Sequence, residues 1–163
     1  HIMTILTEMT IFLAQPSDAK VIQSVLHSAF RRHQLPAFPF SAANVPIEQV
    51  NQWIEWQQLY VVKKGSEWLG VFRLSEYPEY GLVLSRLAVG TFGEGKGKTL
   101  LEAAEHTALN LGFPTLHLKT PKEHPFLVNY YLTRGYEISG ESFKEGDSFI
   151  EFVFAKALQP CAE

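Results

Sequence analysis

Residues 82–111 constrain the fold of this chain more than any other stretch, because they combine three structural signals in order. Residues 82–89 are apolar at positions on both faces of a strand, which is typical of a central strand covered from both sides. Residues 90–97 form a glycine-rich turn. A helix with one apolar face is predicted from about Lys98 onward, and Gly112 stands where glycine often ends a helix.

The glycine-rich turn predicts an anion-binding site. Gly93, Gly95 and Gly97 alternate, so the backbone N–H groups there are not covered by side chains. Such N–H groups, together with the positive end of the following helix, attract phosphate. Lys96 and Lys98 add positive charge. The alternative is a plain strand-to-helix turn in which the glycines serve the backbone geometry alone.

Two common phosphate-binding patterns do not fit this turn. The Walker A pattern requires a glycine five residues before Gly97, and that position is Phe92. The chain has two aspartates, Asp18 and Asp147, and neither ends an apolar strand where a magnesium ligand is expected. The glycine spacing of a Rossmann fold fails as well. These mismatches argue against a nucleotide-dependent kinase.

Three runs between Leu82 and Tyr136 resemble the GCN5-related N-acetyltransferases: LSRLAV, GEGKGKTLLEAAEHTA and YYLTRGY. In that family a loop of the form (Gln/Arg)-x-x-Gly-x-(Gly/Ala) holds the pyrophosphate of acetyl-CoA. Gly95 and Gly97 match its end, and Phe92 replaces its Gln or Arg. The resemblance implies an α/β fold of the α+β mixed-sheet kind, with about six to seven strands flanked by about four helices.

The order of the predicted elements agrees with that fold. The elements are a strand at 10–14, a helix after 16–18, a helix at 47–58, a hairpin of 59–63 and 68–74, the central strand, its helix, a strand at 115–120, a helix at 126–134, and strands at 136–139 and 148–154. A single domain is predicted over residues 1–163, with 1–3 as a cloning remnant and start, and 159–163 as a loose tail.

The resemblance also implies which residues bind acetyl-CoA. Backbone groups near the end of the central strand would hold the pantetheine arm, and one N–H there could stabilise the oxyanion. His124 stands where the family often has an asparagine that touches the cofactor, and a role as helix cap is the alternative. The implied cofactor-binding residues are Leu87, Ala88, Val89, Phe92, Gly93, Glu94, Gly95, Lys96, Gly97, Lys98, Thr99, His124 and Tyr131.

Tyr131 and Glu79 are the implied catalytic candidates. Tyr131 occupies the family's tyrosine position and could protonate the leaving thiolate, while the alternative is a core aromatic residue. Tyr130 is expected to suit the core better than Tyr131 does. The strand glutamate of many relatives is missing, since Gly81 or Val83 takes its place, and Glu79 is the nearest acidic residue. The alternative for Glu79 is a solvated charge in a turn.

The acceptor site is the least specified part. In such acetyltransferases the segment between the first two helices helps to shape it, and this segment contains Phe38 and Phe40. Both phenylalanines are candidate substrate-binding residues, and packing on the core is the alternative. Ser85 and His117 are further polar residues on predicted strands, and His117 could equally be a hydrogen-bonded core histidine.

Composition limits the other classes of function. The net charge of −3 argues against nucleic acid or an anionic membrane as a partner. No apolar run reaches the length of a membrane span. The single cysteine, Cys161, excludes a disulfide framework and agrees with a cytoplasmic location. No histidine pair has the spacing of a metal site, so no metal is expected.

The resemblance therefore leads to an N-acetyltransferase that uses acetyl-CoA and acetylates a primary amine of a small molecule, peptide or protein, as a monomer or homodimer. A different class remains open, namely a non-catalytic acyl-CoA-binding or sensing module of the same fold. The departures at Phe92, at His124 and at the strand glutamate favour this second hypothesis. Turnover of acetyl-CoA with a panel of amines separates the two.

Overall fold

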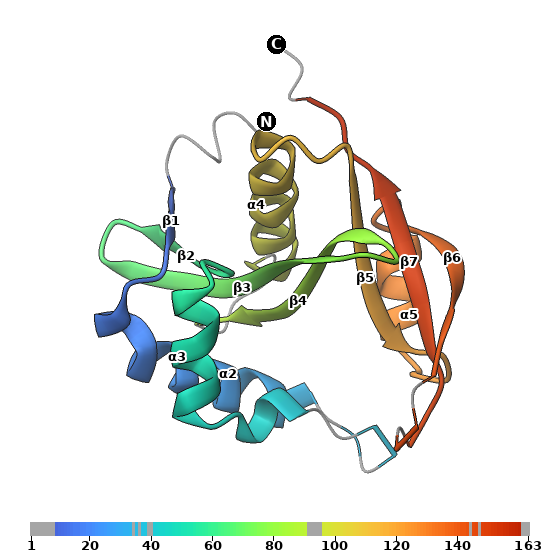
Figure 1. The fold of residues 1–163 in the computed structure, drawn as a ribbon, viewed down its shortest axis with the longest axis horizontal. Helices are drawn as coiled ribbons and strands as arrows, with labels where there is room; N and C mark the ends of the chain where they lie inside the picture. The colour runs from blue at the N-terminus through green and yellow to red at the C-terminus, as the bar shows by residue number, and fades with distance from the viewer. Residues whose placement is uncertain are drawn as a thin grey trace.

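The structure is a computed structural model that describes residues 9–33, 35, 37–38, 41–90, 96–143, 145–146 and 148–160. These residues form one seven-stranded sheet in the order β1-β2-β3-β4-β5-β7-β6 (Figure 1). The strands are β1 (Thr10–Leu13), β2 (Leu59–Lys64), β3 (Glu67–Tyr77), β4 (Gly81–Val89), β5 (Thr115–Pro121), β6 (Glu137–Ser142) and β7 (Glu151–Ala157). The helices are α2 (Ala19–His33), α3 (Ile47–Glu55), α4 (Lys96–Asn110) and α5 (Leu127–Leu132), with 3-10 turns η1 (Pro16–Asp18) and η2 (Ser41–Asn44).

Two hydrophobic clusters lie on opposite faces of the sheet. One is formed with α4 and α5, and the other with α2 and α3. Figure 1 shows α4 on one side of β3 and β4, with α2 and α3 on the other. Gly70 of β3 permits the close approach of α4, because a Cβ there would lie 2.7 Å from a methyl carbon of Leu100. The strands at the centre of the sheet are thus covered on both faces, as predicted for residues 82–89.

β4 and β5 are the one parallel pair of neighbouring strands in the described sheet, and they separate along their length. They pair at Val83 and His117, and beyond that point the two strands diverge (Figure 1). Every other neighbouring pair is antiparallel. The backbone groups of β4 that point toward β5 therefore lack a ladder partner beyond Val83.

A β-bulge interrupts β4 a few residues after its pairing with β5 at Val83. Phe72 of β3 lies opposite two residues of β4, Arg86 and Leu87. Arg86 has a φ of 55°, a left-handed conformation that costs a non-glycine residue roughly 1–2 kcal/mol. A bulge breaks the alternation of side chains between the two faces of a strand. The local backbone of β4 thus departs from regular geometry where the strand separates from β5.

The predicted fold class, a mixed sheet of about six to seven strands with about four helices, is confirmed. Several predicted bounds are wrong by a few residues. α4 begins at Lys96, two residues before the predicted start at Lys98. β6 continues to Ser142, beyond the predicted end at residue 139. The prediction ended too early because the second half of the strand is polar and partly exposed and so carries no hydrophobic pattern. β7 begins at Glu151 and ends at Ala157, later than the predicted 148–154.

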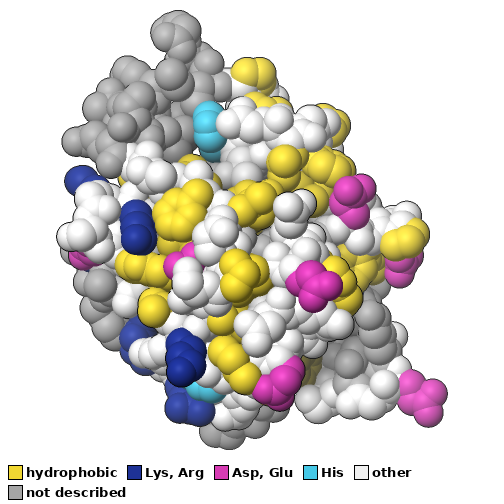
Figure 2. All heavy atoms as spheres, turned by 60° about the vertical axis from the view of Figure 1, so that its left-hand side comes forward, with side chains coloured by type: hydrophobic (Ala, Val, Ile, Leu, Met, Phe, Trp, Pro, Cys, Tyr) yellow, Lys and Arg dark blue, Asp and Glu magenta, His cyan; other side chains and the backbone are white. Residues whose placement is uncertain are grey.

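The outer surface is mixed in character. Figure 2, which brings the β1 side of the molecule forward, shows apolar side chains scattered over this face, with Lys and Arg toward one border and Asp and Glu toward the other. No helix in the described part of the chain has the length and apolar character needed to cross a membrane.

Candidate active site

A cavity of about 480 Å³ lies where β4 and β5 separate. Consecutive residues of β5 line this cavity although their side chains alternate between the two faces of the sheet. Leu118 and Thr120 lie on one face, and Lys119 lies on the other. The cavity therefore passes through the sheet rather than lying on one side of it. Its described lining is Phe30, Ser41, Ala42, Arg73, Tyr77, Val83, Leu84, Ser85, Arg86, Leu87, Leu118, Lys119, Thr120, Pro121, Leu127, Tyr131, Ser142, Phe149 and Glu151.

Two arginines reach the cavity from neighbouring strands and share one aromatic ring. The guanidinium carbon of Arg73 lies 4.7 Å from the ring centre of Trp53, and that of Arg86 lies 5.2 Å from it. Burial, and next the charge of Arg73, lower the pKa of Arg86 below its ordinary value. Trp53 belongs to α3, so both guanidinium groups lie on the α2–α3 face of the sheet. The bulge explains this position of Arg86, since it follows Ser85, which pairs with Arg73 on that same face.

Three polar atoms at the cavity are buried without a hydrogen-bond partner among the described residues. They are the hydroxyl oxygens of Ser85 and Thr120 and the Nε of Arg86. Thr120 is only 3% exposed. Buried polar groups in native proteins nearly always have a partner, and leaving one unpaired costs about 1–3 kcal/mol. A bound polar ligand in the cavity would supply these partners.

The charges of the described lining are mostly positive. Arg73, Arg86 and Lys119 face a single carboxylate, that of Glu151 at the start of β7. The charge of Glu151 acts on Arg86 and partly offsets the lowering of the Arg86 pKa by burial and by Arg73. Lys119 lies 5.0 Å from the ring centre of Tyr80. The electrostatic field of the cavity therefore favours an anionic group.

Tyr131 of α5 lines the cavity from the α4 side of the sheet. Its ring packs against those of Tyr136 and Phe154, at centroid distances of 5.8 and 6.0 Å. Burial, followed by the neighbouring Tyr130, raises the pKa of its hydroxyl above the ordinary value. Tyr131 therefore packs on the hydrophobic core and borders the cavity at the same time. The expectation that Tyr130 suits the core better is wrong, because Tyr131 is the one that packs against the core cluster.

Tyr130 lies beside the start of α4 instead. A Cβ at Gly97 would lie 3.6 Å from the Tyr130 hydroxyl. Lys98 is exposed in the same turn, and Lys96 lies 3.4 Å from the carboxylate of Glu67. The first-turn N–H groups of a helix have no partner within the helix, and they attract anions. Of the features that predicted an anion site, Lys96, Gly97 and Lys98 lie at the start of α4, while Gly93 and Gly95 lie outside the described residues.

Part of the predicted cofactor loop lies outside the described residues, namely Phe92, Gly93, Glu94 and Gly95. Thr99 follows the first residues of α4 and is partly buried. Leu87 lines the cavity, and its neighbours Ala88 and Val89 continue β4 toward α4. Of these three, Ala88 is almost fully buried on the α2–α3 side. The predicted cofactor contacts of these residues stay predictions.

His124 caps α5, as the alternative for this residue supposed. Its Nδ1 accepts hydrogen bonds of 3.1 Å from the backbone N–H groups of both Phe126 and Leu127. An Nδ1 that accepts hydrogen bonds carries no proton, so the ring is neutral in this arrangement. Burial lowers the pKa of His124 below its ordinary value, which keeps the ring in the capping form. The cap fixes the start of the helix that positions Tyr131.

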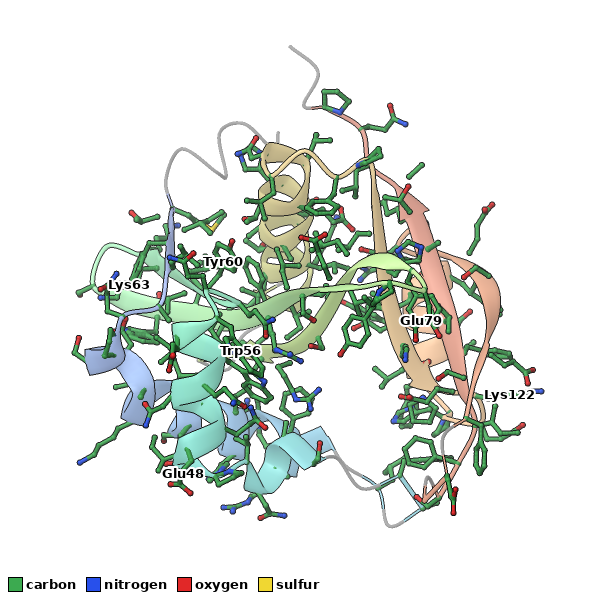
Figure 3. The ribbon with its side chains drawn as sticks, in the orientation of Figure 1. Glu48, Trp56, Tyr60, Lys63, Glu79 and Lys122 are labelled. Atoms are coloured by element: carbon green, nitrogen blue, oxygen red, sulfur yellow. The ribbon has the colours of Figure 1, made fainter. Side chains whose placement is uncertain are left out.

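The remaining predicted site residues do not lie together at the cavity. Glu79 is exposed in the turn between β3 and β4 (labelled in Figure 3) and is not part of the described cavity lining. Phe38 packs edge-on against Phe149, which lines the cavity, at 5.5 Å between ring centres. Phe40 lies outside the described residues. His117 is hydrogen-bonded, with its Nδ1 3.3 Å from the carbonyl oxygen of Leu82.

Sequence reasoning missed Arg73, Arg86, Thr120 and Glu151 as cavity residues. Arg73 offers one usable signal, because a charged residue in the otherwise apolar strand 68–74 requires a special environment. Arg86 itself offers no signal in the sequence that would identify it as a cavity residue. Strict alternation along β4 would place it on the face opposite Ser85, and only the bulge brings the two together.

The chain is similar to known proteins in both sequence and structure. S-alkylcysteine N-acetyltransferase of Bacillus subtilis (strain 168) is 28% identical over 159 residues, which cover 91% of this chain and 88% of that protein. The yncA protein of Salmonella typhimurium, solved with its cofactor acetyl-CoA, has a TM-score of 0.67 at 16% identity, over 96% of this chain and 97% of that chain.

A third similar protein is N-acetylglutamate synthase from Neisseria gonorrhoeae, complexed with coenzyme A and N-acetyl-glutamate. It has a TM-score of 0.66 at 14% identity, over 93% of this chain and 35% of that chain. At such identities the two solved structures show a shared fold and no more.

The model of the acetyltransferase (GNAT) family matches residues 25–136. This span is more than half of the chain and contains β4, α4, β5 and α5, the elements around the opening in the sheet. The resemblance inferred from the sequence motifs is thereby confirmed: this chain belongs to the GNAT family of acetyltransferases.

Proposed function

We propose that this protein transfers the acetyl group of acetyl-CoA to a primary amine of a small molecule or peptide. The observation that carries the proposal is the cavity that passes through the sheet between β4 and β5. An opening of this kind lets a donor from the α4–α5 side meet an acceptor from the α2–α3 side. Fixing two reactants in contact removes much of the entropic barrier of a bimolecular reaction.

The residues on the α4–α5 side suit acetyl-CoA. The first turn of α4 offers N–H groups for phosphate, with Lys98 nearby. The unpaired edge of β4 near Leu87 and the orphan hydroxyl of Thr120 offer hydrogen bonds to an amide-containing arm. Acetyl-CoA supplies the thioester carbonyl that a neutral amine attacks. The solved fold neighbours with acetyl-CoA or coenzyme A support this choice of donor.

Tyr131 is proposed as the proton donor to the leaving thiolate. A tyrosine hydroxyl is protonated at neutral pH and is able to donate a hydrogen bond to the developing thiolate, and burial, which raises its pKa, makes it a weaker acid but leaves this donor in place. The backbone N–H groups of β4 at Leu87 are the proposed stabilisers of the oxyanion. Two carboxylates compete for the role of base, Glu79 in its exposed turn and Glu151 in the cavity lining.

The acceptor is proposed to be a small amine. The relative that acetylates S-alkylcysteines makes these amino acids the first acceptors to test. The cavity volume of about 480 Å³ falls in the range of small-molecule sites, which is roughly 300–1,000 Å³. A peptide amine would have to enter the same opening with its terminal residue.

The proposal is tested by incubating the protein with acetyl-CoA and a panel of amines that includes S-methyl-L-cysteine. The acetylated products are measured by mass spectrometry, and the release of the coenzyme A thiol is measured in the same reactions. We expect acetylated amine and free coenzyme A to form in equal amounts. Calorimetric titration provides a second readout, in which coenzyme A binds and ATP with magnesium does not.

Coenzyme A binding without acetylation of any amine would favour the acyl-CoA-binding or sensing module. His124 is the specific observation that supports this second function, because its Nδ1 already accepts two backbone N–H groups of α5. Tighter binding of ATP than of coenzyme A would contradict both functions.

A further inference from the structure

We propose that the amine acceptor also carries a carboxylate, and that Arg86 binds this carboxylate on the α2–α3 side of the cavity. This inference rests on the proposed function and assigns the substrate class of the same site. The acceptor would then belong to the amino acids or to peptides bound through a free carboxyl group, and simple alkylamines would be poor substrates.

The described lining of the cavity has an excess of positive charge. Arg73, Arg86 and Lys119 line it together with one carboxylate, that of Glu151, whose charge acts on Arg86. An acceptor that carried only an ammonium group would enter against this field. A zwitterion complements it, because its carboxylate meets the arginines while its amine is held elsewhere in the cavity.

Arg86 has hydrogen-bonding capacity that the described residues do not use. Its Nε is shielded from solvent and has no partner among the described residues. One terminal nitrogen lies 3.4 Å from the hydroxyl of Ser41, a long contact that leaves most of the donors available. A guanidinium group offers five N–H donors in a planar fork that matches a carboxylate. A carboxylate would therefore satisfy donors that the protein itself leaves unpaired.

Contacts around Arg86 hold it in this position. Trp53 packs against its guanidinium group. Arg73 packs against the same ring and is fixed by a 2.9 Å hydrogen bond from its Nε to the side-chain oxygen of Gln58. The bulge gives Arg86 its left-handed backbone, and strain of this kind collects at functional positions. A preorganised guanidinium group loses little conformational freedom when it binds an anion.

Ser85 adds a neutral donor beside the arginine. Its hydroxyl is buried without a partner, and its pairing with Arg73 in the sheet places it on the same face. Arg86 and Ser85 together form a short polar wall at the cavity. We assign the carboxylate of the acceptor to this wall, with Arg73 acting through its charge.

The test compares three forms of one acceptor: S-methyl-L-cysteine, its amide, and 2-(methylthio)ethylamine, which lacks the carboxyl group. Phenylalanine, phenylalaninamide and phenethylamine form a second set. We expect kcat/KM for the amino acid to exceed that of both other forms by about 30-fold or more, the effect of one charge-assisted contact. The amide controls for amine basicity, because its amine is more readily neutral than that of the amino acid.

Variants test whether Arg86 causes the preference for an acceptor with a carboxylate. Arg86→Gln is expected to reduce the ratio of kcat/KM between amino acid and decarboxylated amine to below about 3-fold. The preference that remains would come from the charges of Arg73 and Lys119. Arg31→Gln is the matched control, because Arg31 is an exposed arginine of α2 outside this cavity lining, and it should keep the wild-type ratio. Melting curves verify that both variants fold, and Arg86→Lys provides a second substitution that keeps the charge but loses the fork.

The outcomes distinguish this inference from the proposed function. Equal acetylation of all three forms would overturn the carboxylate assignment and leave the acetyltransferase intact, and so would a full preference that survives in Arg86→Gln. If no amine is acetylated, the three forms are titrated calorimetrically against the coenzyme A complex. Tighter binding of the amino acid, lost in Arg86→Gln, would then support the carboxylate site while the proposed reaction falls, and equal or absent binding would overturn both.

Discussion

Tyr131 packs on the hydrophobic core and borders the cavity, and we propose that its hydroxyl also takes part in the reaction. Its ring packs on Tyr136 and Phe154, and its side chain also borders the cavity between β4 and β5. Burial, which raises the pKa of its hydroxyl, makes it a weaker acid but leaves its proton in place at neutral pH. Packing by the ring and proton donation by the hydroxyl are separable, since phenylalanine retains the first and lacks the second.

Tyr131→Phe is expected to lower kcat by about 10²-fold or more, because the departing thiolate loses its proton donor. The melting temperature and the Kd for coenzyme A should change little, because the ring and its packing remain. Steady-state kinetics, thermal melts and calorimetry measure the three quantities.

Tyr130→Phe is the matched control for this prediction. It removes the neighbouring hydroxyl, which lies beside Gly97 and does not line the cavity, so kcat should stay within about 3-fold of wild type. If Tyr131→Phe also keeps near wild-type turnover, Tyr131 is structural and another group or water protonates the thiolate.

The residues of the site differ in how far the sequence could predict them. Tyr131 stands in a motif, so a resemblance was enough to single it out. Arg86 follows Ser85 in a strand, and the pleat alone would send the two to opposite faces. Its place beside Arg73 depends on the bulge and on Trp53 of α3, which are tertiary features. Residue type and spacing do not encode either of them.

At the scale of elements, β4 and α4 form the side of the opening on which we propose that acetyl-CoA binds. The hydrophobic pattern predicted both elements, because each has apolar residues at the spacing of a buried strand or helix face. It failed at the polar end of β6, where exposed residues continue the strand without such a pattern. The start of α4 lies two residues earlier than predicted, which places Lys96 and Gly97 inside its first turn. Gly97 thus belongs to the helix end that would face phosphate.

Gly97→Val should weaken coenzyme A binding more than it harms folding. Among the described residues, a Cβ at this position would approach the Tyr130 hydroxyl alone, at an ordinary contact distance of 3.6 Å, so we expect the apo protein to tolerate it. The larger side chain obstructs the approach of phosphate to the first-turn N–H groups. With ligand at about 100 times Kd, coenzyme A should raise the wild-type melting temperature by roughly 5–10 °C, and most of this shift should be lost in the variant.

Lys96→Ala serves as the comparison at the same helix end. It removes a charge that already lies near Glu67 and adds no bulk, so most of the ligand-induced shift should remain. A full shift in Gly97→Val would show that the phosphates of coenzyme A bind away from the start of α4.

At the scale of the whole molecule, the arrangement of strands determines where chemistry is possible. Antiparallel pairing extends through both halves of the sheet, while β4 and β5 meet at one residue pair and then separate. The element order along the chain was sufficient to predict a mixed sheet, because parallel neighbours need a crossover helix. The separation of the two strands is seen only in the structure, because no local sequence pattern measures the angle between strands.

Donor and acceptor are proposed to meet in the opening between β4 and β5, and a crystal structure of the complex with coenzyme A tests this proposal. We expect phosphate oxygens within hydrogen-bonding distance of the first-turn N–H groups of α4, and the thiol in the opening near Leu87 and Tyr131. A complex in which coenzyme A lies elsewhere on the protein, with its thiol remote from this opening, would contradict the proposal.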